Sequence, residues 1–114
     1  MEGTETTEIF IPGNYVGQPT SPSPRDAVVL FYFKEFGGFH NVTLAIFHVG
    51  DFGVKRMGDR VRVGTTGGRG GGQGKTRNLH AHFELWRGRH RSVLTGNAKY
   101  NARISWAATN FCSP

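Results

Sequence analysis

The chain has 114 residues, the length of one domain, and 37% of them are apolar, which is enough for a modest core. Its 17 glycines are about twice average usage and favour strands and turns over helices. No run approaches the roughly 20 apolar residues that span a bilayer, and no charged-then-apolar signal peptide opens the chain. Cys112 is the only cysteine, so no intrachain disulfide can form, and cysteine usage does not indicate a redox compartment.

The net charge of +6 is unevenly distributed along the chain. Residues 1–53 carry two basic and six acidic side chains, a net charge of −4, whereas residues 54–114 carry twelve basic and two acidic ones, a net charge of +10. A basic half suits a polyanionic partner such as nucleic acid, an anionic cell-wall polymer or a lipid surface. Basic residues that only keep a glycine-rich β surface soluble would give the same pattern.

Residues 1–26 are predicted to be an extended lead-in, and residues 27–114 the β domain. The lead-in is polar and has three prolines between positions 19 and 24, which preclude a helix, although a short strand over 8–11 fits the pattern. The β-branched and aromatic run at 27–33 predicts a buried strand, followed by a hairpin turn at 35–38 and a returning strand over 41–49.

The second half of the chain predicts further strands separated by turns. Gly58-Asp59 is typical of a tight turn between two short strands, and residues 64–74, with seven glycines in eleven positions, predict an irregular loop. Residues 79–86 predict a strand, and residues 92–94 and 102–106 predict two more. Helix signals are nearly absent, so the predicted fold class is all-β, a small and mostly antiparallel sheet with long glycine-rich loops.

Two glycine-rich motifs invite a phosphate-binding or RNA-binding interpretation. The end of a P-loop is suggested by Gly74-Lys75-Thr76, but a P-loop needs glycine five residues earlier, where Arg69 stands, and no helix is predicted to follow. A single Arg-Gly-Gly at 69–71 lacks the repetition of RNA-binding tails. Nucleic-acid binding therefore rests mostly on charge.

The most informative pattern is the sequence Leu-His-Ala-His-Phe-Glu-Leu at 79–85. In an extended strand, His80, His82 and Glu84 share one face, with the two imidazoles about 7 Å apart. Imidazole is the commonest zinc ligand and the usual general base near neutral pH, so the strand can supply a metal ligand and a proton-transfer group together. The alternative is a solvent-facing strand edge that carries two histidines.

Three further histidines lie elsewhere in the chain. His48 ends the mostly apolar run 43–48, where a histidine is either a satisfied core residue or one that faces the His80–His82 strand. We expect His40, at the hairpin, and His90, in a basic turn, to be solvated.

The order of these elements resembles the lysostaphin-type zinc metallopeptidases, which cut peptide cross-bridges of bacterial peptidoglycan. The resemblance covers residues 27–87. It consists of an apolar strand closing on His48, the turn Val-x-x-x-Gly-Asp-x-Val at 54–61, Gly-Thr-Thr-Gly with a glycine-rich loop, and His-x-His-Phe-Glu at 80–84.

The resemblance implies a role for each of three histidines. It makes His82 a zinc ligand, His80 the residue that orients or deprotonates water and stabilises the oxyanion, and His48 the second non-ligand histidine of the site. It also implies that the loop 64–74 borders the substrate groove, and that the protein acts outside the cell, in the periplasm or in a phage particle.

One part of the family pattern is missing. The family's other two zinc ligands come from an upstream His-x-x-x-Asp motif, but no histidine precedes His40, and Leu44 stands four residues after it. Asp26 or an N-terminal glutamate could substitute, although no spacing points to either. The chain is therefore either a fragment or a degenerate relative.

Two functions of different classes follow. The first is a zinc-dependent endopeptidase acting on peptidoglycan cross-links, or its inactive remnant. The second is a non-catalytic β-module that binds an anionic cell-wall polymer, or that serves as a structural part of a phage or cell-wall complex. Nucleic-acid binding through the Arg-rich half is the third alternative, and it predicts an affinity that falls steeply with salt.

Overall fold

The computed structural model describes residues 2–3, 6–23, 27–67 and 79–106. The described elements are ten strands and one helix, in chain order β1 (Glu2–Gly3), β2 (Glu8–Pro12), β3 (Val16–Ser23), β4 (Val28–Phe36), β5 (Phe39–Phe47), β6 (Val49–Gly50), β7 (Lys55–Met57), β8 (Arg60–Thr66), β9 (Leu79–His80), β10 (His82–Arg87) and α1 (Gly96–Ala102). No helix in these ranges has the length and apolar composition to cross a membrane.

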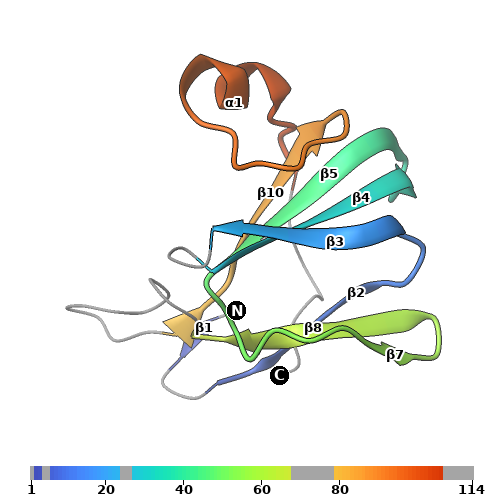
Figure 1. The fold of residues 1–114 in the computed structure, drawn as a ribbon, viewed down its shortest axis with the longest axis vertical. Helices are drawn as coiled ribbons and strands as arrows, with labels where there is room; N and C mark the ends of the chain where they lie inside the picture. Colours follow the sequence, from blue (N-terminus) through green and yellow to red (C-terminus); the bar gives the residue numbers. More distant parts are fainter. Residues whose placement is uncertain (1, 4–5, 24–26, 68–78, 107–114) are drawn as a thin grey trace.

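The strands form two four-stranded antiparallel sheets and one short separate pair (Figure 1). Sheet I has the order β10-β5-β4-β3, and sheet II has the order β2-β8-β6 with β7 also paired to β8. β1 pairs with β9. The predicted all-β, mostly antiparallel fold is confirmed.

The β4–β5 hairpin forms the centre of sheet I. Its turn is the pair Gly37 and Gly38, which have φ angles of 52° and 89°. Positive φ at both central residues is what a type I′ hairpin turn requires, and glycine adopts it without steric cost. The predicted hairpin is confirmed, and so is the turn at Gly58-Asp59 between β7 and β8.

Sheets I and II pack face to face around one apolar core. Because side chains alternate along a strand, every second residue of β4 and β5 points toward sheet II. The buried core residues are Ile9, Ile11, Val29, Phe31, Phe33, Phe36, Val42, Leu44, Ile46, Val49, Val61, Val63 and Leu85. With Leu85 of β10 in this core, the neighbouring residues Glu84 and Trp86 face the opposite side of sheet I.

Residues 87–106, which we call the basic cap, begin with the last residue of β10; their first part covers that opposite side, whereas Ile104 and Trp106 pack against the core between the sheets. The segment has five arginines and lysines and no aspartate or glutamate. Figure 1 shows α1 on the side of sheet I away from sheet II. Apolar cap residues pack there on a second cluster. Its buried members are Val28, Leu30, Ala45 and Trp86, and its partly buried members are Phe47, Val93, Leu94 and Ala102.

The last two predicted strands are wrong. Residues 92–94 form no strand, and residues 96–102 form α1. Of residues 102–106, Arg103 makes one bridge to Trp86, and the Ile104 amide donates to the Leu85 carbonyl at 2.8 Å. Val93, Leu94 and Ala102 of the cap instead pack, partly buried, on the outer face of sheet I, which needs no strand partner.

Residues 1–26, expected as an extended lead-in, contribute strands to both sheets. The strand considered for 8–11 is confirmed as β2, which pairs with β8 and buries Ile9 and Ile11. β3 pairs with β4 at the edge of sheet I, with irregular register. An edge strand tolerates proline because half of its amides need no partner strand.

The predicted irregular loop over 64–74 is wrong for its first three residues, which belong to β8. A side-chain Cβ at Gly64 would lie 2.4 Å from the carbonyl oxygen of Gly50, so glycine allows the close approach of β6 and β8. Residues 68–78 lie outside the described part of the chain.

Candidate functional site

The two histidines of the His-x-His segment belong to different strands. β9 ends at His80 and pairs with β1, whereas β10 begins at His82, which lies opposite Phe47 of β5. The predicted continuous strand is therefore wrong at Ala81, because its two halves pair with strands in different places. Beyond the break the expected alternation holds, with Glu84 buried on the outer side of sheet I.

His48 and His80 lie together, with ring centroids 5.1 Å apart in an edge-to-face arrangement. His48 stands between β5 and β6, where the chain leaves sheet I for sheet II, and its φ of 69° is unusual for a residue with a side chain. Such backbone conformations cluster at functional sites. The fold thus pairs the two residues for which the resemblance implies non-ligand roles.

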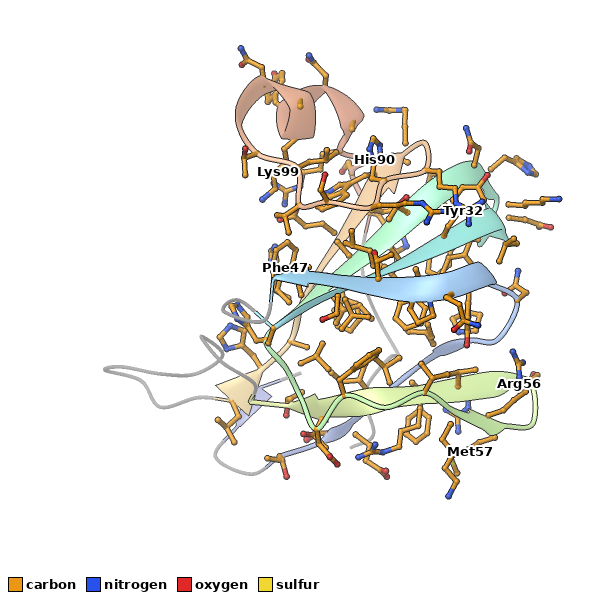
Figure 2. All side chains as sticks on the ribbon, in the orientation of Figure 1. Tyr32, Phe47, Arg56, Met57, His90 and Lys99 are labelled. Carbon is orange, nitrogen blue, oxygen red and sulfur yellow. The ribbon has the colours of Figure 1, made fainter. Side chains whose placement is uncertain are left out.

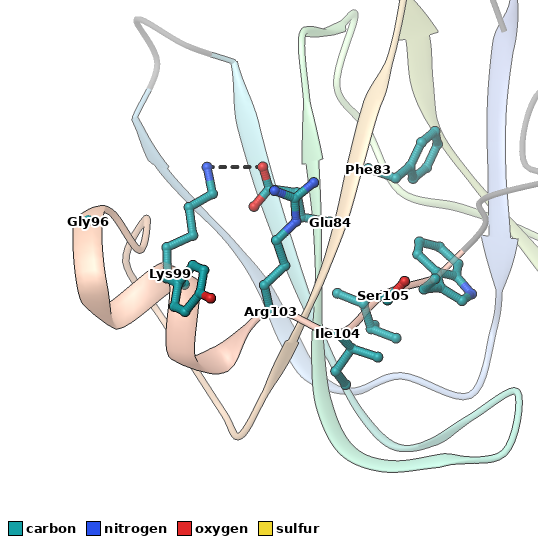
Figure 3. Close-up of a pocket in the computed structure, with 10 residues that line it drawn as sticks. Phe83, Glu84, Gly96, Lys99, Arg103, Ile104 and Ser105 are labelled. Atoms are coloured by element: carbon teal, nitrogen blue, oxygen red, sulfur yellow. Dashed lines mark ion pairs between the residues drawn. The ribbon is translucent and has the colours of Figure 1, made fainter.

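His82 belongs to a neighbouring cluster built on the carboxylate of Glu84, whose side chain is only 2% exposed. Its Nε2 lies 2.8 Å from Glu84 Oε2, and Trp86 Nε1 donates to Oε1 at 2.9 Å. Lys99 Nζ, from α1, lies 3.0 Å from the same Oε2 (Figure 3). Two side chains of β10 and one of the basic cap therefore converge on one buried carboxylate.

Phe47 separates the two groups of residues. Its ring centroid is 6.3 Å from that of His48 and 5.2 Å from that of His82. Lys99 Nζ also lies over this ring, 5.6 Å from the centroid, and Figure 2 shows both side chains on the cap side of sheet I. An aromatic face thus lies between the His48–His80 pair and the Glu84 cluster.

The protonation of this cluster follows from its hydrogen bonds. Burial by itself raises the pKa of Glu84, but hydrogen bonds from His82, Trp86 and Lys99 outweigh it and hold that pKa below its ordinary value. Glu84 is therefore an ionised acceptor at neutral pH. His82 Nε2 must carry the shared proton, which leaves Nδ1 as the ring atom with a lone pair when the imidazole is neutral.

Of these residues, the resemblance makes only His82 a zinc ligand. A histidine that binds a metal through one ring nitrogen commonly donates its other ring N–H to a carboxylate, as His82 does to Glu84. A catalytic zinc, however, takes three protein ligands, and within the described ranges no three His, Cys, Asp or Glu side chains gather to hold a metal. The ammonium of Lys99 beside Glu84 adds repulsion for a dication. The described donor set does not fit a catalytic zinc, and Asp26 lies outside it.

Lys99 was not a candidate from the sequence because it lies far from the histidines and in a region predicted to lack helix. A usable signal was present in residues 95–102, where Thr95 is a common helix-capping residue and two alanines follow four positions apart. That pattern would have placed Lys99 on a helix, although not against Glu84.

The turn after β10 is held firmly against β5. Gly88 N donates to the Asn41 carbonyl at 2.7 Å, Thr43 Oγ1 donates to the Gly88 carbonyl at 2.7 Å, and His90 N donates to Thr43 Oγ1 at 3.0 Å. His90, expected to be solvated, is partly buried, and its ring packs on Trp86 with the ring centroids 6.1 Å apart. His40 is exposed, as expected.

A cleft of about 600 Å³ opens between β10 and α1 (Figure 3). Its walls include Lys99, Arg103 and Tyr100, and Tyr100 is 82% exposed. Since Lys99 is paired with Glu84, Arg103 contributes the cleft's uncompensated charge among the described residues.

No family model, curated protein or solved structure matches this chain.

Proposed function

We propose that the protein is a non-catalytic β-module that binds an anionic polymer of the bacterial cell wall through its basic cap. The observation that carries the proposal is the charge of residues 87–106. This segment has five arginines and lysines and no carboxylate, and Lys99 is the one of the five with a carboxylate partner in the described part of the chain. The other four cations are available to a polyanion.

The Glu84 cluster supports a non-catalytic role. His82 is hydrogen-bonded to an ionised carboxylate that also holds an ammonium, and the described ranges offer no three-ligand site. The same cluster ties α1 to β10 and so keeps the cap in place on sheet I. In this proposal Glu84 stabilises the binding surface.

We choose a cell-wall polymer as the ligand because the sequence resembles enzymes that act on peptidoglycan. The order of motifs over 27–87 resembles a wall-directed family, and binding can persist in a relative that has lost its metal ligands. Charge supplies the second support, because an anionic wall polymer complements the cap.

Cosedimentation of the full chain with purified bacterial cell walls tests the proposal. We expect saturable binding that weakens as sodium chloride rises from about 50 to about 300 mM, because counterions screen the exposed cations. Walls stripped of their anionic polymer should retain little protein. Equal binding to stripped walls would contradict the proposal.

A pair of charge-matched variants locates the surface. Arg91→Gln with Arg103→Gln removes two cations from the basic cap, whereas Lys55→Gln with Arg60→Gln removes two from sheet II. Neither pair contains a cation with a carboxylate partner in the described structure. We expect wall affinity to fall about tenfold or more in the first pair and to stay within about twofold in the second, since only the first removes attraction at the site. Equal losses would show that net charge alone drives binding.

A zinc endopeptidase is the second candidate, favoured by the 5.1 Å contact between His48 and His80. It requires two further zinc ligands from outside the described ranges. Elemental analysis of protein purified without chelators separates the candidates. About one zinc per chain, lost in His82→Ala, would favour the peptidase, and a chain free of zinc would favour the binding module.

A further inference from the structure

We infer that the basic cap and sheet I together form a binding site for a phosphate group, centred on Arg89. The identity of the polymer in this inference rests on the proposed function. The inference adds which charged group of that polymer the protein recognises. The site is a small hollow between the turn after β10 and strands β3 and β4. Its lining residues are Gln18, Thr20, Leu30, Tyr32, Arg89, His90 and Arg91.

Arg89 is held in place without any ligand. Its guanidinium carbon lies 4.7 Å from the centre of the Tyr32 ring, and the Tyr32 hydroxyl donates to Asn41 Oδ1 at 2.7 Å. Gly17 of β3 lies beneath it, where a side-chain Cβ would come within 2.7 Å of Nη2. A cation ordered in advance loses little conformational entropy when it binds a ligand.

The backbone that carries Arg89 is fixed as well. The hydrogen bonds from Gly88 to Asn41 and from His90 to Thr43 lie on either side of it. His90 Nε2 also donates to the Arg87 carbonyl, at 2.6 Å. The turn therefore presents Arg89 and Arg91 from a rigid support.

The hollow also contains an unsatisfied polar group. Thr20 Oγ1 is buried and has no hydrogen-bond partner among the described residues. Buried polar atoms are nearly always paired in native proteins, and an exception calls for a bound water or ion. Neither Arg89 nor Arg91 has a carboxylate partner in the described structure, so the positive charge is uncompensated.

The donor arrangement favours a phosphate. The planar guanidinium group of arginine binds phosphate through two parallel hydrogen bonds. Two arginines together can offset more than one negative charge on the phosphate. Thr20 of β3 and the two arginines of the facing turn line the hollow, so polar groups stand on two sides of it. The enclosed part of the hollow is only about 10 Å³, room for one oxygen-sized atom, so a single phosphate oxygen enters it while the rest of the group and of the polymer stays at the open mouth.

A polymer without bases fits this hollow better than a nucleic acid does. Single-stranded nucleic acids are bound by aromatic rings on which bases stack. The face of Tyr32 is already covered by Arg89. The phosphodiester of a wall polymer is therefore the ligand that the site favours.

The experiment is an NMR titration of the full chain, labelled with nitrogen-15, with inorganic phosphate and then with a short glycerol phosphodiester oligomer. Acetate at equal ionic strength is the anion control. The test variants are Arg89→Lys, which keeps the charge and loses the fork, and Thr20→Val, which keeps the shape and loses the hydroxyl. Arg60→Lys is the matched control, because Arg60 also lies 4.7 Å over an aromatic ring, that of Phe10, but on sheet II.

We expect both phosphate ligands to shift the Arg89 and Thr20 resonances saturably, with acetate causing little change. Arg89→Lys should weaken phosphate binding about tenfold or more and Thr20→Val several-fold, whereas Arg60→Lys should bind as the native chain does. Equal shifts with acetate, or native affinity in Arg89→Lys, would overturn the site. A single-stranded oligonucleotide that binds more tightly than the glycerol oligomer would overturn the choice of polymer.

Failure of the site and failure of the proposed function give different results. If Arg89→Lys loses phosphate binding but keeps full wall binding, the phosphate site is not where the wall polymer binds, and the proposed function stands without it. If the native chain binds phosphate but no walls, the proposed function fails and the polymer assignment fails with it.

Discussion

Replacing Glu84 by glutamine tests whether its carboxylate holds the basic cap on sheet I. The amide oxygen can still accept from Trp86, but the amide nitrogen then faces two donors, His82 and Lys99. Two hydrogen bonds to a charged group are worth roughly 3–6 kcal/mol when buried. His82 and Lys99 are 45% and 30% exposed, so water replaces part of this loss. We expect the free energy of unfolding to fall by about 2–3 kcal/mol.

Urea denaturation followed by tryptophan fluorescence measures this change, because Trp86 donates directly to Glu84. Glu35→Gln is the matched control, since Glu35 is exposed and forms no ion pair in the described structure, and it should change stability by less than about 0.5 kcal/mol. Lys99→Met alone should cost about 1 kcal/mol, and a double-mutant cycle with Glu84→Gln should give a coupling of about 1 kcal/mol or more. A loss below about 0.5 kcal/mol in Glu84→Gln would refute the reasoning.

Three further predictions concern stability. Because the pKa of Glu84 is lowered on folding, its contribution is present above the ordinary value of 4.5 and is lost as pH falls below it. The stability difference between the native chain and Glu84→Gln should therefore shrink from pH 5 toward pH 3 in urea titrations, and a constant difference would refute this. Trp86→Phe should cost about 2–3 kcal/mol by the same assay, since it removes a buried donor to a charged group, and a cost under about 0.5 kcal/mol would contradict the role given to that donor. Gly64→Ala should lower the thermal midpoint clearly, because its Cβ would meet the Gly50 carbonyl, whereas Gly53→Ala, with open space, should leave it nearly unchanged.

Much of the fold follows from local sequence patterns. The apolar strands and glycine turn of the β4–β5 hairpin are specified by residues close together in the chain, as is the turn at Gly58. Helix α1 has a local signal in residues 95–102, but its position against β10, through the contact from Lys99 to Glu84, is set by tertiary packing and cannot be read from that signal. The break at Ala81 was missed for a related reason, since it depends on which strands accept β9 and β10 as partners.

The candidate site was predictable only in part. Alternation along β10 placed His82 and Glu84 on one face, and the apolar strand ending at His48 brought that residue near His80. The hollow around Arg89 could not be read from sequence. It depends on Gly17 and Tyr32 lying beneath Arg89, which is 72 and 57 residues further along the chain, an arrangement that only the packing of β3 and the cap creates.

Incubation of the full chain with bacterial cell walls and added zinc tests the central claim most directly, with bound protein and newly released amino groups measured in the same samples. We predict saturable binding, sensitive to Arg91→Gln with Arg103→Gln, and no release of amino groups above that from walls alone. Amino-group release that disappears in His82→Ala would contradict the account and identify the protein as an active endopeptidase.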